Sequence, residues 1–412
     1  MRNQIIIKVS LLLLFTPLVG SGQPLTDLLS IARNNNLELK ALHQEYLAAL
    51  EKGPQVSQLP DPEVGVGAFV FPVETRLGAQ QARLGVSQMF PWFGTLEARE
   101  EVVLANARAL QEKVASTALE LDFQVKTAYF QLYEIQTAQN ILRQNIRILE
   151  ALRQLSLAKV ESGQGTNADV LRVDLKIQEL EQELLILDNQ LEKPLADINQ
   201  ILNRPLDASV EVQDTFEFAF MPYNKDTLRS HIRNNHPMIR MFALQQKASR
   251  RAIELNELEG RPSFGLGMDY ILVNPRSDAT PVNNGRDVLQ LSAKVSIPLW
   301  REKYNAKERE ENLKVAALEN RKMDLETRFL AMIERAFSDY EMARLREELY
   351  EKQIATTKAT IQILQTDYSS TGDHFDELLR LENDLVDYEL KILKAIVQSQ
   401  IARAVIERYL KF

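Results

Sequence analysis

The sequence predicts a mainly α-helical protein with a small β part, built as two tandem repeats of the order helix, strand, strand, long helix, turn, helix. Three observations predict this. Residues of the first half recur in the second half at fixed spacings. Two long stretches, about 96–162 and 302–371, contain no proline and keep a helical apolar period. Two pairs of shorter segments alternate between apolar and polar residues, which is typical of strands.

The internal repeat appears as residues that recur 200 positions later near the start of the chain and 208 positions later further on. Leu28, Arg33, Asn34, Asn35 and Pro62 recur as Leu228, Arg233, Asn234, Asn235 and Pro262, and Leu121 and Val125 match Phe329 and Ile333. The additional residues fall in 274–287, a segment rich in proline, asparagine and glycine that is typical of a surface loop. We therefore expect a first repeat at 23–205, an equatorial connector at 206–223 and a second repeat at 224–412.

The N-terminus and the charge balance restrict where the protein acts. Residues 1–22 begin with Arg2 and Lys8, continue as an apolar run and end in small residues, which predicts a secretory signal peptide. The apolar run is shorter than the roughly 20 residues of a membrane-spanning helix. The chain has 57 acidic and 49 basic residues and no cysteine. It therefore has no disulfide framework and no thiol for a lipid anchor, and nucleic acid is an unexpected partner for so acidic a chain.

Each repeat begins with a helix and continues with two strands. The first helix, at about 24–52, is followed by prolines that end it. Alternation of apolar and polar residues predicts strands at about 62–72 and 80–92, and in the second repeat at about 262–273 and 287–299. The apolar face of these strands would form a core in a soluble sheet, or would face lipid in a membrane barrel.

The only two tryptophans, Trp92 and Trp300, lie where strand gives way to helix in each repeat. Packing at the junction is one explanation. A girdle at a membrane surface is the other, since Trp and Tyr favour the boundary between lipid and water. The equivalent positions in both repeats favour the second explanation, so Trp92, Phe93 and Trp300 are candidate membrane-interface aromatics.

In the long stretches the apolar residues step by three and four positions, which predicts coiled-coil packing. As continuous helices, each stretch would be roughly 100 Å long at 1.5 Å per residue. Shorter helices at about 166–202 and 375–411 follow after two turns. A long helix would then run beside two short helices stacked end to end, with the connector and the C-terminus at the middle.

Two turns reverse the chain between the long helices and the shorter ones. In the first, Gly163 and Gly165 can end the incoming helix, Thr166 or Asn167 can cap the outgoing helix, and Asp169 suits its first turn. Gly372 marks the equivalent second turn.

Four strands are too few for a closed membrane barrel, which needs at least eight. Unpaired strand edges cannot face lipid, because unsatisfied backbone groups there cost several kcal/mol each. Several chains must therefore share one barrel if the strands enter a membrane. Three chains would give 12 strands, although the strand count also permits two or four chains.

The order and doubling of these features resemble the TolC family of outer-membrane efflux proteins. The resemblance rests on the two-copy pattern, on the junctions Phe90 to Gly94 and Ile297 to Trp300, and on the two turns, and it covers essentially the whole mature chain. The sequence from Leu59 to Pro62 is most similar to the cation-efflux, CusC-like branch. The family implies a homotrimer: a 12-stranded β-barrel in the outer membrane of a Gram-negative bacterium, continuing into a coiled-coil α-helical tunnel through the periplasm.

The same resemblance implies a function and partners. The protein would be the passive, gated exit duct of a tripartite efflux or type I secretion-like system that carries small toxic solutes or metal cations. Its partners would be a periplasmic adaptor (membrane fusion) protein, an inner-membrane efflux pump and outer-membrane lipid, with no cofactor. The first turn, with Gly163, Gly165, Thr166 and Asp169, would meet the adaptor together with Gly372.

In the family, aspartates on the helix after the second turn narrow the tunnel. The matching run here extends from Glu377 to Arg380, so Glu377 keeps an acid and Arg380 departs from the pattern. This departure leaves two forms of the closed gate: a ring of acidic side chains, or an ion pair between Glu377 and Arg380 of neighbouring copies that locks the closed state. Asp373 and Asp376 are further gate candidates, or simply acids that cap a helix.

No arrangement of residues predicts an enzyme or a metal site. The four histidines are scattered: His231 and His236 are five positions apart, which does not suit a zinc pair on one helix face. No glycine-rich phosphate loop or nucleophile elbow is found. The competing interpretation is a non-membrane periplasmic coiled-coil scaffold, which explains the long helices but neither the doubled strands nor the paired tryptophan junctions.

Overall fold

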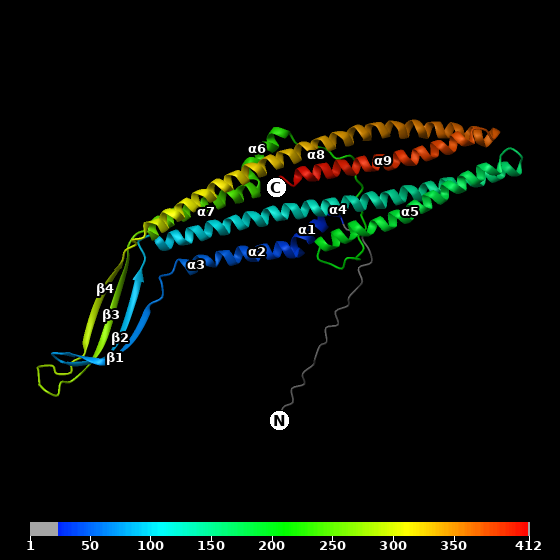
Figure 1. Cartoon of the computed structure of the whole chain (residues 1–412). Helices are drawn as coiled ribbons and strands as arrows, with labels where there is room; N and C mark the ends of the chain where they lie inside the picture. Colours follow the sequence, from blue (N-terminus) through cyan, green and yellow to red (C-terminus); the bar gives the residue numbers. More distant parts are fainter. Residues whose placement is uncertain (1–23, 411–412) are drawn as a thin grey trace, which may run out of the picture. The chain divides into compact units, whose positions relative to one another are not determined.

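The computed structural model describes residues 24–410, so the predicted signal peptide lies outside the described residues. The order helix, strand, strand, long helix, turn, helix occurs twice along the chain, which confirms the predicted fold class of two mainly helical repeats (Figure 1). The elements are α1 (Leu25–Asn35), α2 (Leu37–Leu50), α3 (Lys52–Val56), β1 (Glu63–Thr75), β2 (Gly78–Phe90), α4 (Thr95–Glu161), α5 (Asn167–Ile201), α6 (Lys225–Asn235), α7 (Pro237–Glu259), β3 (Ser263–Asn274), β4 (Val288–Ser296), α8 (Arg301–Thr371) and α9 (Phe375–Glu407).

The first helix of each repeat is broken rather than continuous. The break after α1 lies at Asn36, where ψ is 125°, and its side-chain amide donates a hydrogen bond of 3.3 Å to the carbonyl oxygen of Ile201 at the end of α5. The equivalent break lies at His236, where ψ is 129° and Nδ1 accepts a hydrogen bond of 3.2 Å from the amide of Met238. The His236 side chain thereby caps an amide that a continuous helix would bond, whereas the Asn36 side chain satisfies a carbonyl oxygen at the end of α5. None of the helices in residues 24–410 is both long enough and apolar enough to cross a membrane.

The described chain forms two compact units, and both repeats contribute to each. The first unit comprises 24–36, 121–221 and 338–404, and the second comprises 37–120, 222–337 and 405–410. In the first unit, the later parts of α4 and α8 pack with α5 and α9 around a buried core. The core includes Leu142, Leu149, Val173, Leu180, Ile361, Leu364, Tyr368, Phe375 and Leu378.

The connector between the repeats is extended and alternates inward and outward side chains in the first unit. The Gln136 side chain of α4 donates to the carbonyl oxygen of Val210 and accepts from the amide of Val212, at 3.0 and 3.2 Å. The ring of Phe216 packs edge-on against Tyr133 and Phe130, with centroids 5.0 and 5.1 Å apart. The connector is therefore held against α4 by both polar and aromatic contacts.

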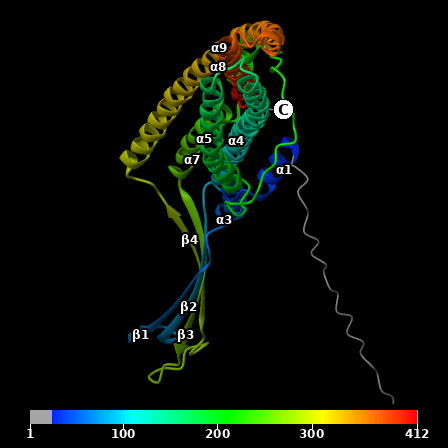
Figure 2. The same ribbon diagram turned by 90° about the vertical axis from the view of Figure 1, so that its right-hand side faces the viewer.

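The four strands form one antiparallel sheet in the second unit, in the order β1-β2-β3-β4 (Figures 1 and 2). Strands β2 and β3, from different repeats, pair in a register that places Val86 opposite Met268. The strand β1 continues to Thr75, beyond the expected end near 72, because a tight turn at 76–77 joins it directly to β2. The strand β4 ends at Ser296, short of the expected 299, just before Pro298, which lacks an amide hydrogen for the ladder.

One face of this sheet is apolar and exposed. It carries Val64, Val66, Leu84, Val86, Leu266, Met268, Leu289 and Leu291, of which Val66 is 81% and Leu291 77% exposed. Within the described residues, the outer edges of β1 and β4 have no partner strand. A single copy therefore leaves both an apolar face and two open edges uncovered.

Candidate functional site

The first turn ends α4 and starts α5 by backbone and side-chain caps. Gly163 has φ +73° and its amide donates to the carbonyl oxygen of Val160, at 3.0 Å, while the amide of Gln164 donates to that of Lys159, at 2.8 Å. These two bonds form a Schellman motif, which favours glycine at the left-handed position. On the outgoing side, the Asp169 carboxylate accepts from the amide of Thr166 at 3.0 Å. The predicted capping roles of Gly163 and Asp169 therefore match the geometry, and the turn is largely exposed.

The second turn uses two left-handed residues in place of one. Gly372 has φ +83° and its amide donates to the carbonyl oxygen of Tyr368 at 3.0 Å. His374 has φ +66°, a conformation that costs a residue with a Cβ about 1–2 kcal/mol. Helix α9 begins immediately afterwards, at Phe375, whose ring packs 5.3 Å from that of Tyr368.

The two turns lie side by side at one end of the first unit (Figure 1). A Cβ at Gly372 would overlap the carbonyl oxygen of Gln164, so the two backbones touch. Arg172 of α5 forms an ion pair with Asp376 of α9. Below them, the hydroxyl of the fully buried Tyr368 donates to Ser156 of α4 at 3.1 Å. The arrangement is one contact surface between the hairpins α4–α5 and α8–α9, which we call the turn pair.

Within one chain, the gate candidates Glu377 and Arg380 contact other partners than each other. Glu377 lies 3.8 Å from Nδ1 of His374, and Arg380 lies 4.0 Å from Asp384, so within one chain Glu377 and Arg380 do not pair. Both side chains are about half exposed or more, and Asp373 is exposed as well. Asp376 does more than cap a helix, because it holds Arg172. A pair between neighbouring copies stays a prediction.

Sequence reasoning missed Arg172, Ser156 and Tyr368 as parts of this site. Arg172 closes the turn pair, yet its partner is 204 positions away. The spacing of the repeats predicts that the two turns are equivalent, but it does not predict that they touch. Glu382 was also missed: it is 4% exposed on α9, accepts a hydrogen bond of 3.2 Å from Gln365 of α8, and burial raises the pKa of its carboxyl.

The junction aromatics lie at the base of the sheet in the second unit. Phe93 and Trp300 are each 83% exposed, at the ends of loops that enter α4 and α8. Trp92 is half-buried and its ring lies 6.0 Å from that of Phe264 at the start of β3. Phe93 and Trp300 are thus exposed in the described chain, whereas Trp92 packs within it, and their place at a membrane surface stays a prediction.

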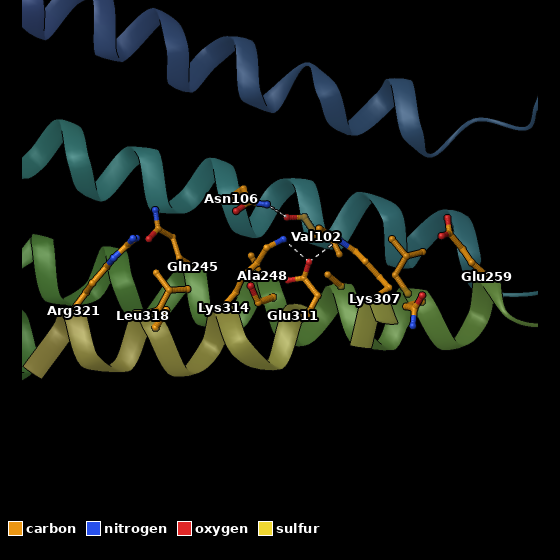
Figure 3. Close-up of a pocket in the computed structure, with 15 residues that line it drawn as sticks. Val102, Asn106, Gln245, Ala248, Glu259, Lys307, Glu311, Lys314, Leu318 and Arg321 are labelled. Atoms are coloured by element: carbon orange, nitrogen blue, oxygen red, sulfur yellow. Dashed lines mark hydrogen bonds and ion pairs between the residues drawn. The ribbon is translucent and has the colours of Figure 1, made fainter. Parts of the chain in front are cut away.

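The second unit also contains a cavity of about 590 Å³ between α4, α7 and α8 (Figure 3). Glu311 of α8 is buried there and accepts from the ammonium groups of Lys307 and Lys314, each at 2.8 Å. Burial opposes its ionisation, but the two lysines lower the pKa of Glu311 overall. No nucleophile and base are paired here, and among residues 24–410 no group of three His, Cys, Asp or Glu side chains is placed to hold a metal.

Residues 28–204 match the sequence model of the family described as outer membrane efflux protein. This part of the chain is similar to that family. The resemblance to TolC-family efflux proteins is thereby confirmed for this part of the chain. A search of curated protein sequences returns no match to the chain.

Solved structures extend the efflux-protein fold over nearly the whole chain. The outer-membrane channel OprN is 18% identical, with a TM-score of 0.72 over 93% of this chain and 89% of its own. The MtrE outer membrane channel of Neisseria gonorrhoeae, in its open state, is 16% identical, with a TM-score of 0.73 over 93% and 88%. CusC is 14% identical, with a TM-score of 0.70 over 93% and 90%. The likeness to CusC is no greater than the others, so assignment to its branch stays a prediction.

Proposed function

We propose that this efflux protein is the outer-membrane exit duct of a tripartite efflux or type I secretion-like system, a passive channel with a gate at the turn pair. The observation that carries the proposal is the sheet of the second unit. An apolar exposed face opposite a polar face, on strands of nine to 13 residues, suits a wall between lipid and a water-filled bore.

The open edges support a homotrimer. Each pair of neighbouring strands is antiparallel, so β1 and β4 run in opposite directions and β4 of one copy can pair antiparallel with β1 of the next. Three copies give 12 strands and leave no edge, which lipid requires. The exposed Phe93 and Trp300 would then lie at the periplasmic boundary of the membrane.

The turn pair supports a gate. Its contacts join the two hairpins of one chain, and three turn pairs around an axis would bring Asp373, Asp376, Glu377 and Arg380 of each copy towards the tunnel centre. The gate residues would form rings there, and rings of charged side chains control which ions pass. Opening would require the hairpins to separate, which a docking adaptor favours if it binds the separated state more tightly.

The remaining assignments complete the duct. The exposed turn with Gly163, Gly165, Thr166 and Asp169, together with Gly372, would meet a periplasmic adaptor protein, and an inner-membrane pump would supply the energy. The helices would extend into the periplasm of a Gram-negative bacterium. The transported solute would be a small toxic compound or a metal cation.

Membrane fractionation tests the proposal against a periplasmic scaffold. The full chain, expressed with its own N-terminus, should appear in the outer-membrane fraction as a trimer that resists detergent until it is heated. A soluble monomer or dimer in the periplasmic fraction would favour the scaffold. The purified trimer should also conduct ions across a planar bilayer.

A further inference from the structure

The polar face of the sheet contains a hollow of about 380 Å³. Its floor is formed by glycines of three strands, and its rim carries charged and hydroxyl side chains. The glycines are Gly65, Gly67, Gly85 and Gly267, and the rim includes Arg83, Asp269 and Lys294. This face is opposite the apolar one, so in the proposed barrel it lines the bore. The inference below rests on that proposed function.

Two of the four glycines are explained by close packing. A Cβ at Gly85 would overlap the Asp269 carboxylate, which lies across it to form a 2.5 Å ion pair with Arg83. A Cβ at Gly267 would lie 2.7 Å from Oγ of Ser292. Any other residue at these positions would displace a neighbouring side chain.

Gly65 and Gly67 on β1 have no such explanation. A Cβ at either position would meet no atom within 4 Å, and neither residue has positive φ. Glycine inside a strand loses more conformational entropy than other residues and costs roughly 0.5–1 kcal/mol. Both positions therefore accept a cost in stability while leaving space that no residue of the described range 24–410 fills.

We propose that Gly65 and Gly67 set the width of the bore, because they keep this part of the barrel wall free of side chains. Three copies would place three hollows around the bore, each beside an Arg83–Asp269 pair that lies flat against the wall.

The test is exclusion of polyethylene glycol from the barrel of the purified, full-length trimer in planar bilayers. Polymers of increasing mass are added on the barrel side only, so that the turn pair does not determine the result. In the variant G65L/G67L the largest polymer that still lowers the current should fall at least twofold in mass. The matched control is A68L, which adds a similar volume on the lipid face of the same strand and should leave the limit unchanged.

The outcomes separate this inference from the proposed function. If the wild-type trimer conducts and G65L/G67L shows the same polymer limit as A68L, these glycines do not set the width of the bore and the inference is wrong. If the wild-type protein does not conduct at all, the proposed function fails instead. If the double variant forms no heat-modifiable trimer, the single variants G67L and G67S replace it. The largest polymer mass that still lowers the current should fall in G67L and stay at the wild-type value in G67S. Equal polymer limits in these two variants would overturn the inference.

Discussion

Arg172 and Asp376 form an ion pair across the two turns, between helices whose contacting residues are 204 positions apart in the sequence. The side chains are 50% and 73% exposed. An exposed ion pair contributes only about 0.2–1 kcal/mol and weakens with salt. The pair can therefore hold the hairpins together without preventing their separation, which suits a gate that a partner must open.

Replacing Arg172 by Gln should raise the open probability of the purified channel at low salt, by up to about fivefold for an interaction of that size. Single-channel recording measures the change. The control is K176Q, which removes a cation one turn further along α5 that pairs only within its own helix, with Glu179. The swapped variant R172D/D376R should restore the closed state. Equal open probabilities for R172Q and K176Q would remove this pair from the gate.

Neutralising Glu377 and Arg380 together should raise single-channel conductance if the two side chains pair between neighbouring copies. Within one chain they face His374 and Asp384 instead. Because the natural chain lacks cysteine, E377C/R380C offers a direct check under oxidising conditions. Covalently linked chains on a non-reducing gel are expected. An unchanged conductance together with unlinked chains would contradict the predicted lock.

Substituting Gly372 by Ala should loosen both turns, whereas Gly163 to Ala should loosen only the first. Both substitutions place a Cβ at positive φ, which costs about 1–2 kcal/mol. Only at Gly372 does the Cβ also overlap the backbone of Gln164, and at Gly163 it meets nothing within 4 Å. Amide hydrogen exchange over 160–166 and 368–376 distinguishes the two results. Equal exchange in the two variants would show that the turns do not depend on each other.

Much of the fold can be predicted from the sequence, but contacts between distant residues cannot. The absence of proline predicts α4 and α8 to within a residue or two, and the alternation around Gly267 and Gly85 predicts strands. The break at Asn36 is not visible in the sequence, because no proline or glycine marks it and it depends on a tertiary contact. The break at His236 has a local signal that sequence reasoning missed, since Pro237 follows it directly and disfavours helix at the preceding residue. Arg172 looked like an ordinary helix residue, since its partner is brought close only by packing of the two repeats.

Acidification should strengthen the packing of α8 against α9 through Glu382. Burial raises the pKa of this carboxyl, so the packed state binds a proton more tightly than the separated or unfolded state. The stabilising effect is complete below the unfolded pKa near 4.3 and is lost as the pH rises through the higher pKa of the packed state. The melting temperature of E382Q should therefore exceed that of the wild-type protein at pH 7 and equal it at pH 4.

The matched variant for this pH dependence is E389Q, because Glu389 pairs with Lys358 at 2.8 Å and is less buried. Its thermal stability should not rise at pH 7. A wild-type melting temperature that does not change between pH 4 and pH 7, or that falls on acidification in a Glu382-dependent way, would contradict the role of this carboxyl.

The most direct test of the account is disulfide crosslinking between the open edges β1 and β4. Cysteine at Val66 is combined in turn with cysteine at Leu289, Leu291 or Ala293, on the lipid face of β4. The control V86C/M268C joins two residues that already face each other within one chain. At least one edge combination should give a ladder of one, two and three chains on a non-reducing gel, and no more. A ladder that continues beyond three chains, or no linkage from any edge combination while the control links, would contradict a barrel shared by three copies.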